Sequence, residues 1–294
     1  LAAEVEAFRQ SVISRARDTQ PRAQALYQRL GLPADWAGAK RVFVVPHGPL
    51  HYLPFQALHD GQQYLVAKVA LGVWPSSGVG TQLLARGPQP PRALLAFGNP
   101  STDRNVPLPG AEREVQQLAA LFERRSVFTQ RDATKAAFKE RSGQASLLHV
   151  AAHAEVDEVD PLFSRILFAS DAADTGLLEA REIFGIKLDG VSLVTLSACE
   201  SGLGRVARGD EILGFTRSFL SAGASSVIAS LWPVSDESTE LLMGRLYRDL
   251  AAGADLMTAM QAAQVEVQKN RRFAHPFFWA PFNVIGNGRM QLGN

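Results

Sequence analysis

The chain has 294 residues, 46% of them hydrophobic and 20% charged, which is typical of a globular protein with one large or two modest domains. A formal net charge of +1 gives no overall field that would favour nucleic acid or a lipid surface as a partner. A single cysteine excludes an internal disulfide and a zinc site built from thiolates, and it suits a reducing compartment, so we expect a cytoplasmic protein.

The sequence predicts no membrane segment and no secretory signal. No uninterrupted apolar run reaches about 18 residues, and the first residues lack the basic and then apolar pattern of a signal peptide. The chain begins with Leu1 and not with Met. We therefore expect it to be part of a longer protein.

The first 90 residues are expected to form a helical segment followed by front strands. Residues 1–32 predict one or two amphipathic helices, broken near Pro21. Residues 41–60 predict a strand, a Pro/Gly turn and a second short segment, and residues 62–75 predict two more short strands.

The Pro- and Gly-rich stretch 81–92 is the expected boundary between residues 1–90 and a main domain at 91–294. In the main domain, apolar runs typical of strands alternate with amphipathic helices. The predicted strands are 93–100, 126–130, 145–154, 164–170 (a hairpin arm), 191–199, 225–234 and 277–286. The predicted helices are 110–125, 133–142, 209–223, 235–253 and 254–270. This alternation predicts an α/β fold with a mostly parallel sheet covered by helices on both faces.

Two reactive side chains stand at the ends of predicted parallel strands. His153 ends the run SLLHVAAH, and Cys199 ends the run SLVTLSAC. Right-handed crossovers bring such strand ends to one edge of the sheet, where α/β folds place their sites. A thiolate and an imidazole are the groups that a cysteine peptidase needs. His153 precedes Cys199 by 46 residues, near the spacing of about 50 found in caspases.

Two other interpretations of Cys199 follow from the residues. A buried cysteine that packs as a small apolar side chain is equally compatible with this position. The run from Cys199 to Arg205 also has the spacing C-x-x-G-x-x-R of a phosphatase loop. Glu200 would place a negative charge beside the phosphate, and Val206 lacks the hydroxyl that helps a thiolate leave, so we reject the phosphatase.

His149 lies on the same face of the predicted strand as His153, about 13 Å away at a rise of about 3.3 Å per residue. It is therefore expected to be an interior, hydrogen-bonded residue. The sequence contains no nucleotide-binding motif and no His or Cys residues at a spacing typical of zinc ligands. We expect no cofactor and no metal site.

Several blocks of the sequence resemble the CHAT domain, a caspase-like cysteine peptidase family related to separase. The blocks are residues 45–68, 147–157, 193–250 and 275–286. The resemblance runs in order from about residue 40 to 287. It implies a caspase-like three-layer α-β-α sandwich with a mostly parallel central sheet. The family's usual partners are tetratricopeptide repeats upstream, which fits a chain that begins inside a longer protein.

The resemblance implies a catalytic dyad of His153 and Cys199. It also implies an oxyanion hole made by the backbone N–H of Cys199 and the N–H of Ala154, the residue after the histidine. That second position is usually Gly in caspase-like enzymes. Ala154 keeps the donor but has less freedom to adopt positive φ.

A shorter stretch of similarity suggests which residues select the substrate. The run LWPVSDES resembles separase's Leu-Trp-x-Val-Thr-Asp, which makes Asp236 a candidate acid in the S1 pocket, although it also suits the first turn of a helix. Asp210 and Glu211 are further candidates with the same alternative. Trp232 either lines the cleft or packs inside, and packing is favoured.

The resemblance implies a regulated cysteine endopeptidase that acts on a protein or peptide substrate, with Arg or Lys at P1. The alternative is a catalytically silent CHAT-type scaffold that binds protein partners. Neither function involves nucleic acid or a membrane.

Overall fold

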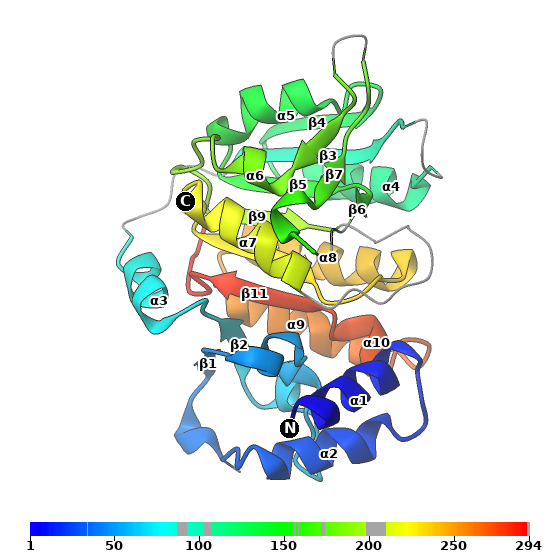
Figure 1. Cartoon of the computed structure of the whole chain (residues 1–294), viewed down its shortest axis with the longest axis vertical. Coiled ribbons are helices and arrows are strands. Elements are labelled where there is room, and N and C mark those ends of the chain that lie inside the picture. Colours follow the sequence, from blue (N-terminus) through cyan, green and yellow to red (C-terminus); the bar gives the residue numbers. More distant parts are fainter. Residues whose placement is uncertain are drawn as a thin grey trace.

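The computed structural model describes residues 1–33, 35–86, 93–102, 107–155, 157, 159–171, 174–197 and 210–292. An eight-stranded sheet runs through the centre, in the order β1-β2-β11-β10-β9-β5-β3-β4 (Figure 1). Its strands are β1 (Arg41–Val44), β2 (Ala70–Val73), β3 (Ala93–Pro100), β4 (Arg124–Gln130), β5 (Leu147–Ala151), β9 (Leu193–Leu196), β10 (Ser226–Ser230) and β11 (Phe282–Gly286).

The described sheet is mostly parallel, as the alternation of strands and helices predicts. Its antiparallel pair is β10 with β11, and the other neighbouring strands run parallel. The last strand, β11, lies between β2 and β10. Strands from residues 1–90 therefore join the same sheet as strands from the main domain, and the division at residue 90 stays a prediction.

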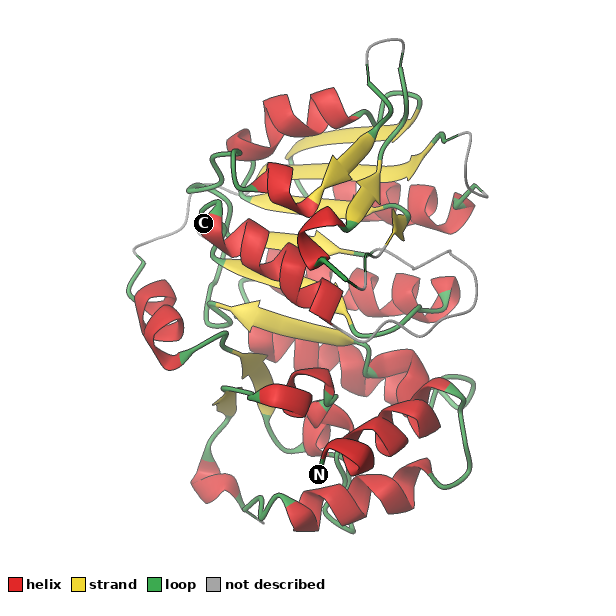
Figure 2. Cartoon of the chain, viewed as in Figure 1, coloured by secondary structure: helices red, strands yellow, loops and turns green. Residues whose placement is uncertain are grey.

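Helices cover both faces of the sheet, which gives three layers (Figure 2). One face carries α4 (Pro109–Ala119), α8 (Asp236–Ala251) and α9 (Leu256–Lys269), and the other carries α5 (Lys135–Arg141), α6 (Ala180–Ile183) and α7 (Asp210–Ser221). The central strands feed both cores because their side chains alternate. In β5, Leu147 and Ala151 pack into the first core, and Leu148 and Val150 pack into the second.

A small antiparallel sheet is inserted between β5 and β9, and it lies in front of the main sheet in Figure 1. Its strands are β6 (Ala154–Glu155), β7 (Arg165–Leu167) and β8 (Leu177–Glu179), with the 3₁₀ turn η6 (Pro161–Phe163) between β6 and β7. The hairpin arm predicted at 164–170 is confirmed by the pairing of β7 with β6 and β8. The insertion begins at the residue after His153.

The N-terminal residues form α1 (Ala2–Ile13) and α2 (Thr19–Arg29), below the sheet in Figure 1. The two predicted helices form, but the break between them lies at residues 14–18 and Pro21 itself lies in the first turn of α2, where a missing N–H costs no hydrogen bond. α10 (Pro276–Trp279) contacts α1, and α3 (Ser77–Leu84) extends into the stretch 81–92 that was expected as the boundary.

Of the two strands predicted at 62–75, the prediction of the first is wrong. Only β2 forms there, and the residues before it form a 3₁₀ turn, η4 (Leu65–Ala67), whose Leu65 and Val66 are buried against the core. The short apolar run indicated burial but not the backbone conformation. None of the helices in the described ranges is both long and apolar enough to cross a bilayer.

Candidate active site

His153 marks the point where the chain leaves the central sheet. β5 ends at Ala151, and the small sheet begins with β6 at Ala154. The side chain of His153 is buried. Its backbone carbonyl accepts a hydrogen bond from the N–H of Leu167 at 2.9 Å. The histidine is thus fixed by two sheets, one on each side of it in the sequence.

The strand that leads to Cys199 lies directly beside β5. β9 runs parallel to β5, with Val150 opposite Leu196. The pairing continues one residue further, since the N–H of Ser197 donates to the Val150 carbonyl at 2.9 Å. His153 and Cys199 each come three residues after this paired position. Cys199 itself lies outside the described residues.

The backbone of Ala154 faces away from its strand partner. Since the carbonyl of His153 accepts from Leu167 on β7, His153 occupies a hydrogen-bonded position of the antiparallel ladder. Backbone groups of successive residues alternate in direction in such a ladder. The N–H of Ala154 is therefore directed to the open side of β6, which is an edge strand.

The insertion packs closely on the helix that follows the cysteine segment. A Cβ added at Gly214 in α7 would lie 2.7 Å from the carbonyl oxygen of Pro161 in η6, a contact that real Cβ atoms do not make. Glycine is required there for this close approach. The residues after His153 and the helix after Cys199 are thus held against each other.

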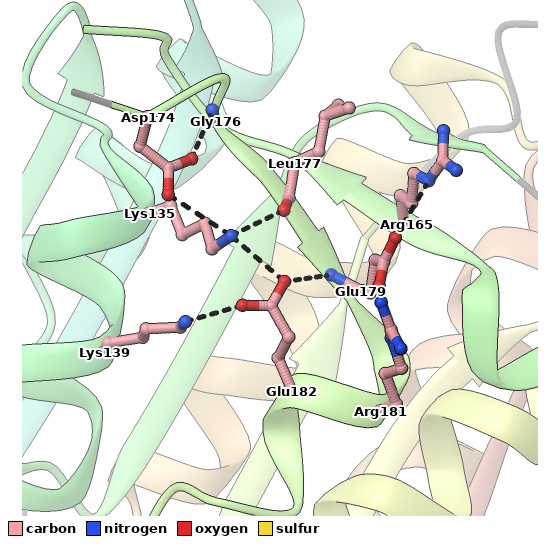
Figure 3. Close-up of polar contacts among 9 residues, drawn as sticks. All are labelled: Lys135, Lys139, Arg165, Asp174, Gly176, Leu177, Glu179, Arg181 and Glu182. Atoms are coloured by element: carbon pink, nitrogen blue, oxygen red, sulfur yellow. Dashed lines mark hydrogen bonds and ion pairs between the residues drawn. The ribbon is translucent and has the colours of Figure 1, made fainter. Parts of the chain in front are cut away.

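A group of ion pairs anchors the insertion to α5 (Figure 3). Lys135 Nζ contacts Glu182 Oε1 at 3.0 Å, Asp174 Oδ2 at 3.3 Å and the Leu177 carbonyl at 2.9 Å. Glu182 Oε2 also accepts from Lys139 Nζ at 2.6 Å, and its Oε1 accepts from the N–H of Glu179 at 3.1 Å. Glu182 therefore ties α5, α6 and the end of β8 together.

Ion pairs also link the three strands of the small sheet. Arg165 on β7 lies between Glu155 on β6 and Glu179 on β8, with a nitrogen-to-oxygen distance of 3.7 Å to each. Glu179 also accepts from Arg181 Nε at 2.5 Å (Figure 3). Opposite charges directly across neighbouring strands stabilise a small sheet modestly. This row holds the register of the strand that begins after His153.

The surroundings of Glu182 set its charge state. Burial raises the pKa of Glu182, but hydrogen bonds from Lys139, the Glu179 N–H and Lys135 outweigh burial and hold the pKa below its ordinary value of 4.5. Burial lowers the pKa of Lys135, and the contacts with Glu182 and Asp174 outweigh it and raise that pKa. Both groups are charged at neutral pH.

Glu182→Gln is expected to lower the free energy of unfolding by about 1–2 kcal/mol at pH 7, because three donors lose a charged acceptor. A lowered folded-state pKa stabilises above the ordinary value of 4.5, and this contribution is lost as the pH falls through the folded-state pKa. The difference between wild type and variant should therefore shrink at pH 3.5 in urea unfolding. Glu140→Gln, whose side chain is 71% exposed, is the control and should change stability by less than about 0.5 kcal/mol. Equal effects of the two variants at pH 7 would contradict the assignment.

The S1 candidates occupy different environments. Asp236 is exposed and begins α8, which follows β10 at the same edge of the sheet as His153. A Cβ added at Gly110, the second residue of α4, would lie 3.0 Å from Asp236 Oδ2. The carboxylate is thus beside the first turns of two helices, whose dipoles favour an anion.

The other S1 candidates differ from Asp236. Trp232 is buried in the first core, and its indole N–H donates to the Phe277 carbonyl at 3.1 Å. This is the packing that the sequence favours. Asp210 and Glu211 form the first turn of α7, and their side chains lie outside the described residues.

His149 is an interior, hydrogen-bonded residue, as expected. Its imidazole contacts Glu114 at 2.7 Å and the hydroxyl of Tyr247 at 3.0 Å. Sequence reasoning missed these two partners. A signal existed for Glu114, because it lies three residues after Ala111 and four before Leu118, on the apolar side of helix 110–125.

Comparison with known proteins places the chain in a family. The family model of the CHAT domain matches residues 20–287. The chain is 27% identical over 327 aligned positions to tetratricopeptide repeat protein 28 of Mus musculus, which covers 91% of the chain and 13% of that protein. It is 34% identical over 111 positions to the Homo sapiens protein of the same name, which covers 38% of the chain and 4% of that protein. The chain thus spans a small part of these relatives.

Solved structures show the same fold. The Arg-specific cysteine proteinase gingipain R superposes with a TM-score of 0.60 at 10% identity, over 96% of this chain and 70% of that one. Separase, in the Saccharomyces cerevisiae separase–securin complex, gives 0.57 at 14% identity, over 83% of this chain and 15% of that one. The expected caspase-like α/β fold is confirmed. Together with the match over residues 20–287, this shows that the chain belongs to the CHAT domain family.

Proposed function

We propose that the chain is a cysteine endopeptidase with His153 as general base and Cys199 as nucleophile. The observation that carries the proposal is the pairing of β5 with β9, because the segments that hold the two residues continue from adjacent parallel strands at matching offsets. The fold is that of gingipain R, an Arg-specific cysteine proteinase. An imidazole within reach of a thiol lowers the pH at which the thiolate forms.

In the proposed reaction, His153 takes the thiol proton and Cys199 Sγ bonds to the carbonyl carbon of the substrate. The carbonyl oxygen becomes an oxyanion in the tetrahedral intermediate. The C–N bond then breaks, His153 gives its proton to the leaving amine, and an acyl-enzyme remains. Water adds to the thioester with His153 again as base, which releases the carboxylic acid and restores the thiol.

The N–H groups of Ala154 and Cys199 are proposed as the donors to the oxyanion. The direction of the Ala154 N–H, away from β7, supports its part of this assignment. A donor that no strand partner takes remains available to a ligand at the edge of β6. The alanine side chain does not interfere, since only the backbone acts.

Hydrolysis of peptides tests the proposed activity. We expect the chain to cleave peptides with Arg or Lys at P1 and Cys199→Ala to lose all cleavage, because no other thiol is present. Undiminished cleavage by Cys199→Ala would refute the proposal. The absence of any cleavage by the wild-type chain would favour a domain that binds protein partners without cutting them.

Asp236 is proposed to bind the basic P1 side chain. Asp236→Asn is expected to lower kcat/KM for an Arg-P1 peptide by roughly 10–100-fold, the value of a hydrogen bond to a charged group, and to leave a neutral-P1 peptide unaffected. Glu237→Gln is the control, since the neighbouring Glu237 is engaged with Arg272 at 2.5 Å. Equal loss for both peptides would show that Asp236 does not select P1.

A further inference from the structure

A chain of four buried polar side chains crosses from α4 to β9. Glu114 Oε1 is 2.7 Å from His149 Nε2, His149 Nδ1 is 3.0 Å from the Tyr247 hydroxyl, and that hydroxyl is 2.9 Å from Thr195 Oγ1. Three of the residues are 0% exposed and Glu114 is 5% exposed. The four residues, called the buried relay below, come from α4, β5, α8 and β9.

The buried relay needs no water to be satisfied. If Tyr247 donates to Thr195, then His149 Nδ1 donates to Tyr247, and Nε2 shares one proton with Glu114. If the hydroxyls are turned the other way, Tyr247 donates to Nδ1 and Nε2–H donates to Glu114. Each direction leaves every group hydrogen-bonded, which buried polar groups require. Removal of one hydroxyl breaks the chain of hydrogen bonds between the two strands.

The buried relay bridges the two strands that lead to the candidate dyad. His149 and Thr195 are directly opposite in the β5–β9 register, and Tyr247 hydrogen-bonds to both of them. Each lies four residues before a dyad residue: His149 before His153, and Thr195 before Cys199. β5 ends at Ala151 and β9 at Leu196, so the buried relay joins the two strands within two residues of their ends. The phenol of Tyr247 on α8 is thus fixed by hydrogen bonds to both β5 and β9.

We propose that Glu114, His149, Tyr247 and Thr195 are positioning residues, which fix β5 and β9 relative to each other so that the residues after them meet in reactive geometry. The inference rests on the proposed function, because it assigns these residues to the His153–Cys199 pair. Neither Tyr247 nor Glu114 lies on β5 or β9. They act through His149 and Thr195.

The buried relay is tested by removing one hydroxyl at a time. Thr195→Val keeps the shape of the side chain, and Tyr247→Phe keeps the ring. The matched control is Thr239→Val, also on α8, whose buried hydroxyl has no hydrogen-bond partner among the described residues. Iodoacetamide labelling, read by mass spectrometry between pH 5 and 9, reports the thiolate of Cys199, and circular dichroism reports folding.

In both relay variants, we expect a folded chain whose labelling rate near pH 6.5 falls about 10–100-fold, the range found when residues that orient a reactive group are lost. The midpoint of the pH profile should move up toward that of an ordinary thiol, about 8.5. Thr239→Val should keep the wild-type profile. A change in packing alone would lower thermal stability and leave this midpoint in place.

The outcomes separate the two proposals. An activated thiol in the wild type that is unchanged in the folded relay variants overturns the positioning role and leaves the proposed function standing. A wild-type midpoint near that of an ordinary thiol overturns the proposed function and the positioning role together. If Tyr247→Phe does not fold, the isosteric Thr195→Val decides alone.

Discussion

His153→Gln is expected to lower kcat/KM for peptide hydrolysis by about 10²–10⁴-fold, the usual contribution of a general base. Glutamine has nearly the size of histidine and can hydrogen-bond, but it cannot take the thiol proton. The change therefore removes proton transfer with little change in packing at this buried position. The measurement is kcat/KM for a single Arg-P1 peptide at several pH values.

A second histidine provides the control for this prediction. His47→Gln is the control, since His47 is exposed and follows β1 at the far end of the sheet order. Activity of His153→Gln within threefold of wild type would exclude His153 as the base.

Glu114→Ala is expected to lower the free energy of unfolding by about 2–3 kcal/mol, because it removes the hydrogen-bond partner of His149 Nε2 and leaves that buried group unsatisfied. His149 is 0% exposed, so water does not replace the lost carboxylate. Burial also raises the pKa of Tyr247, which keeps this phenol a neutral hydrogen-bonding group. Urea unfolding at pH 7 measures the effect.

Glu112→Ala on the same helix is the matched control. Glu112 is only half-buried and accepts from the side-chain amides of Asn99 and Gln130, so its loss should cost about 1 kcal/mol. Glu114→Gln keeps the shape of the side chain and one acceptor oxygen. Its decrease in the free energy of unfolding should lie between those of Glu114→Ala and Glu112→Ala. A loss for Glu114→Ala no greater than that for Glu112→Ala would mean that the pair with His149 contributes no net stability.

The fold class follows from the sequence because local periodicity reports burial. The apolar run before His153 and the run before Cys199 are buried strands, and their alternation with amphipathic helices indicates a parallel sheet. The position of β11 does not follow from local pattern. β11 pairs with β2, whose residues lie more than 200 positions earlier in the sequence. It also runs antiparallel to β10, and no local motif encodes that direction.

Some features of the candidate site can likewise be predicted from the sequence, and others cannot. The placement of His153 at the end of β5 follows from the strand pattern, and the interior role of His149 follows from its distance along the strand. The partners of His149 do not, because the positions of Glu114 and Tyr247 on two separate helices depend on how those helices cross the sheet. The break between β5 and β6 was also absent from the predicted strand 145–154.

The pH dependence of Cys199 labelling in the wild type and in His153→Gln tests most directly the claim that these two residues form a catalytic pair. The chain has one cysteine, so the label reports one thiol without knowledge of the substrate. We predict a wild-type midpoint below about pH 7.5 and a midpoint near 8.5 in His153→Gln. Midpoints near 8.5 in both proteins would show that the histidine does not activate the thiol and would contradict the proposed function.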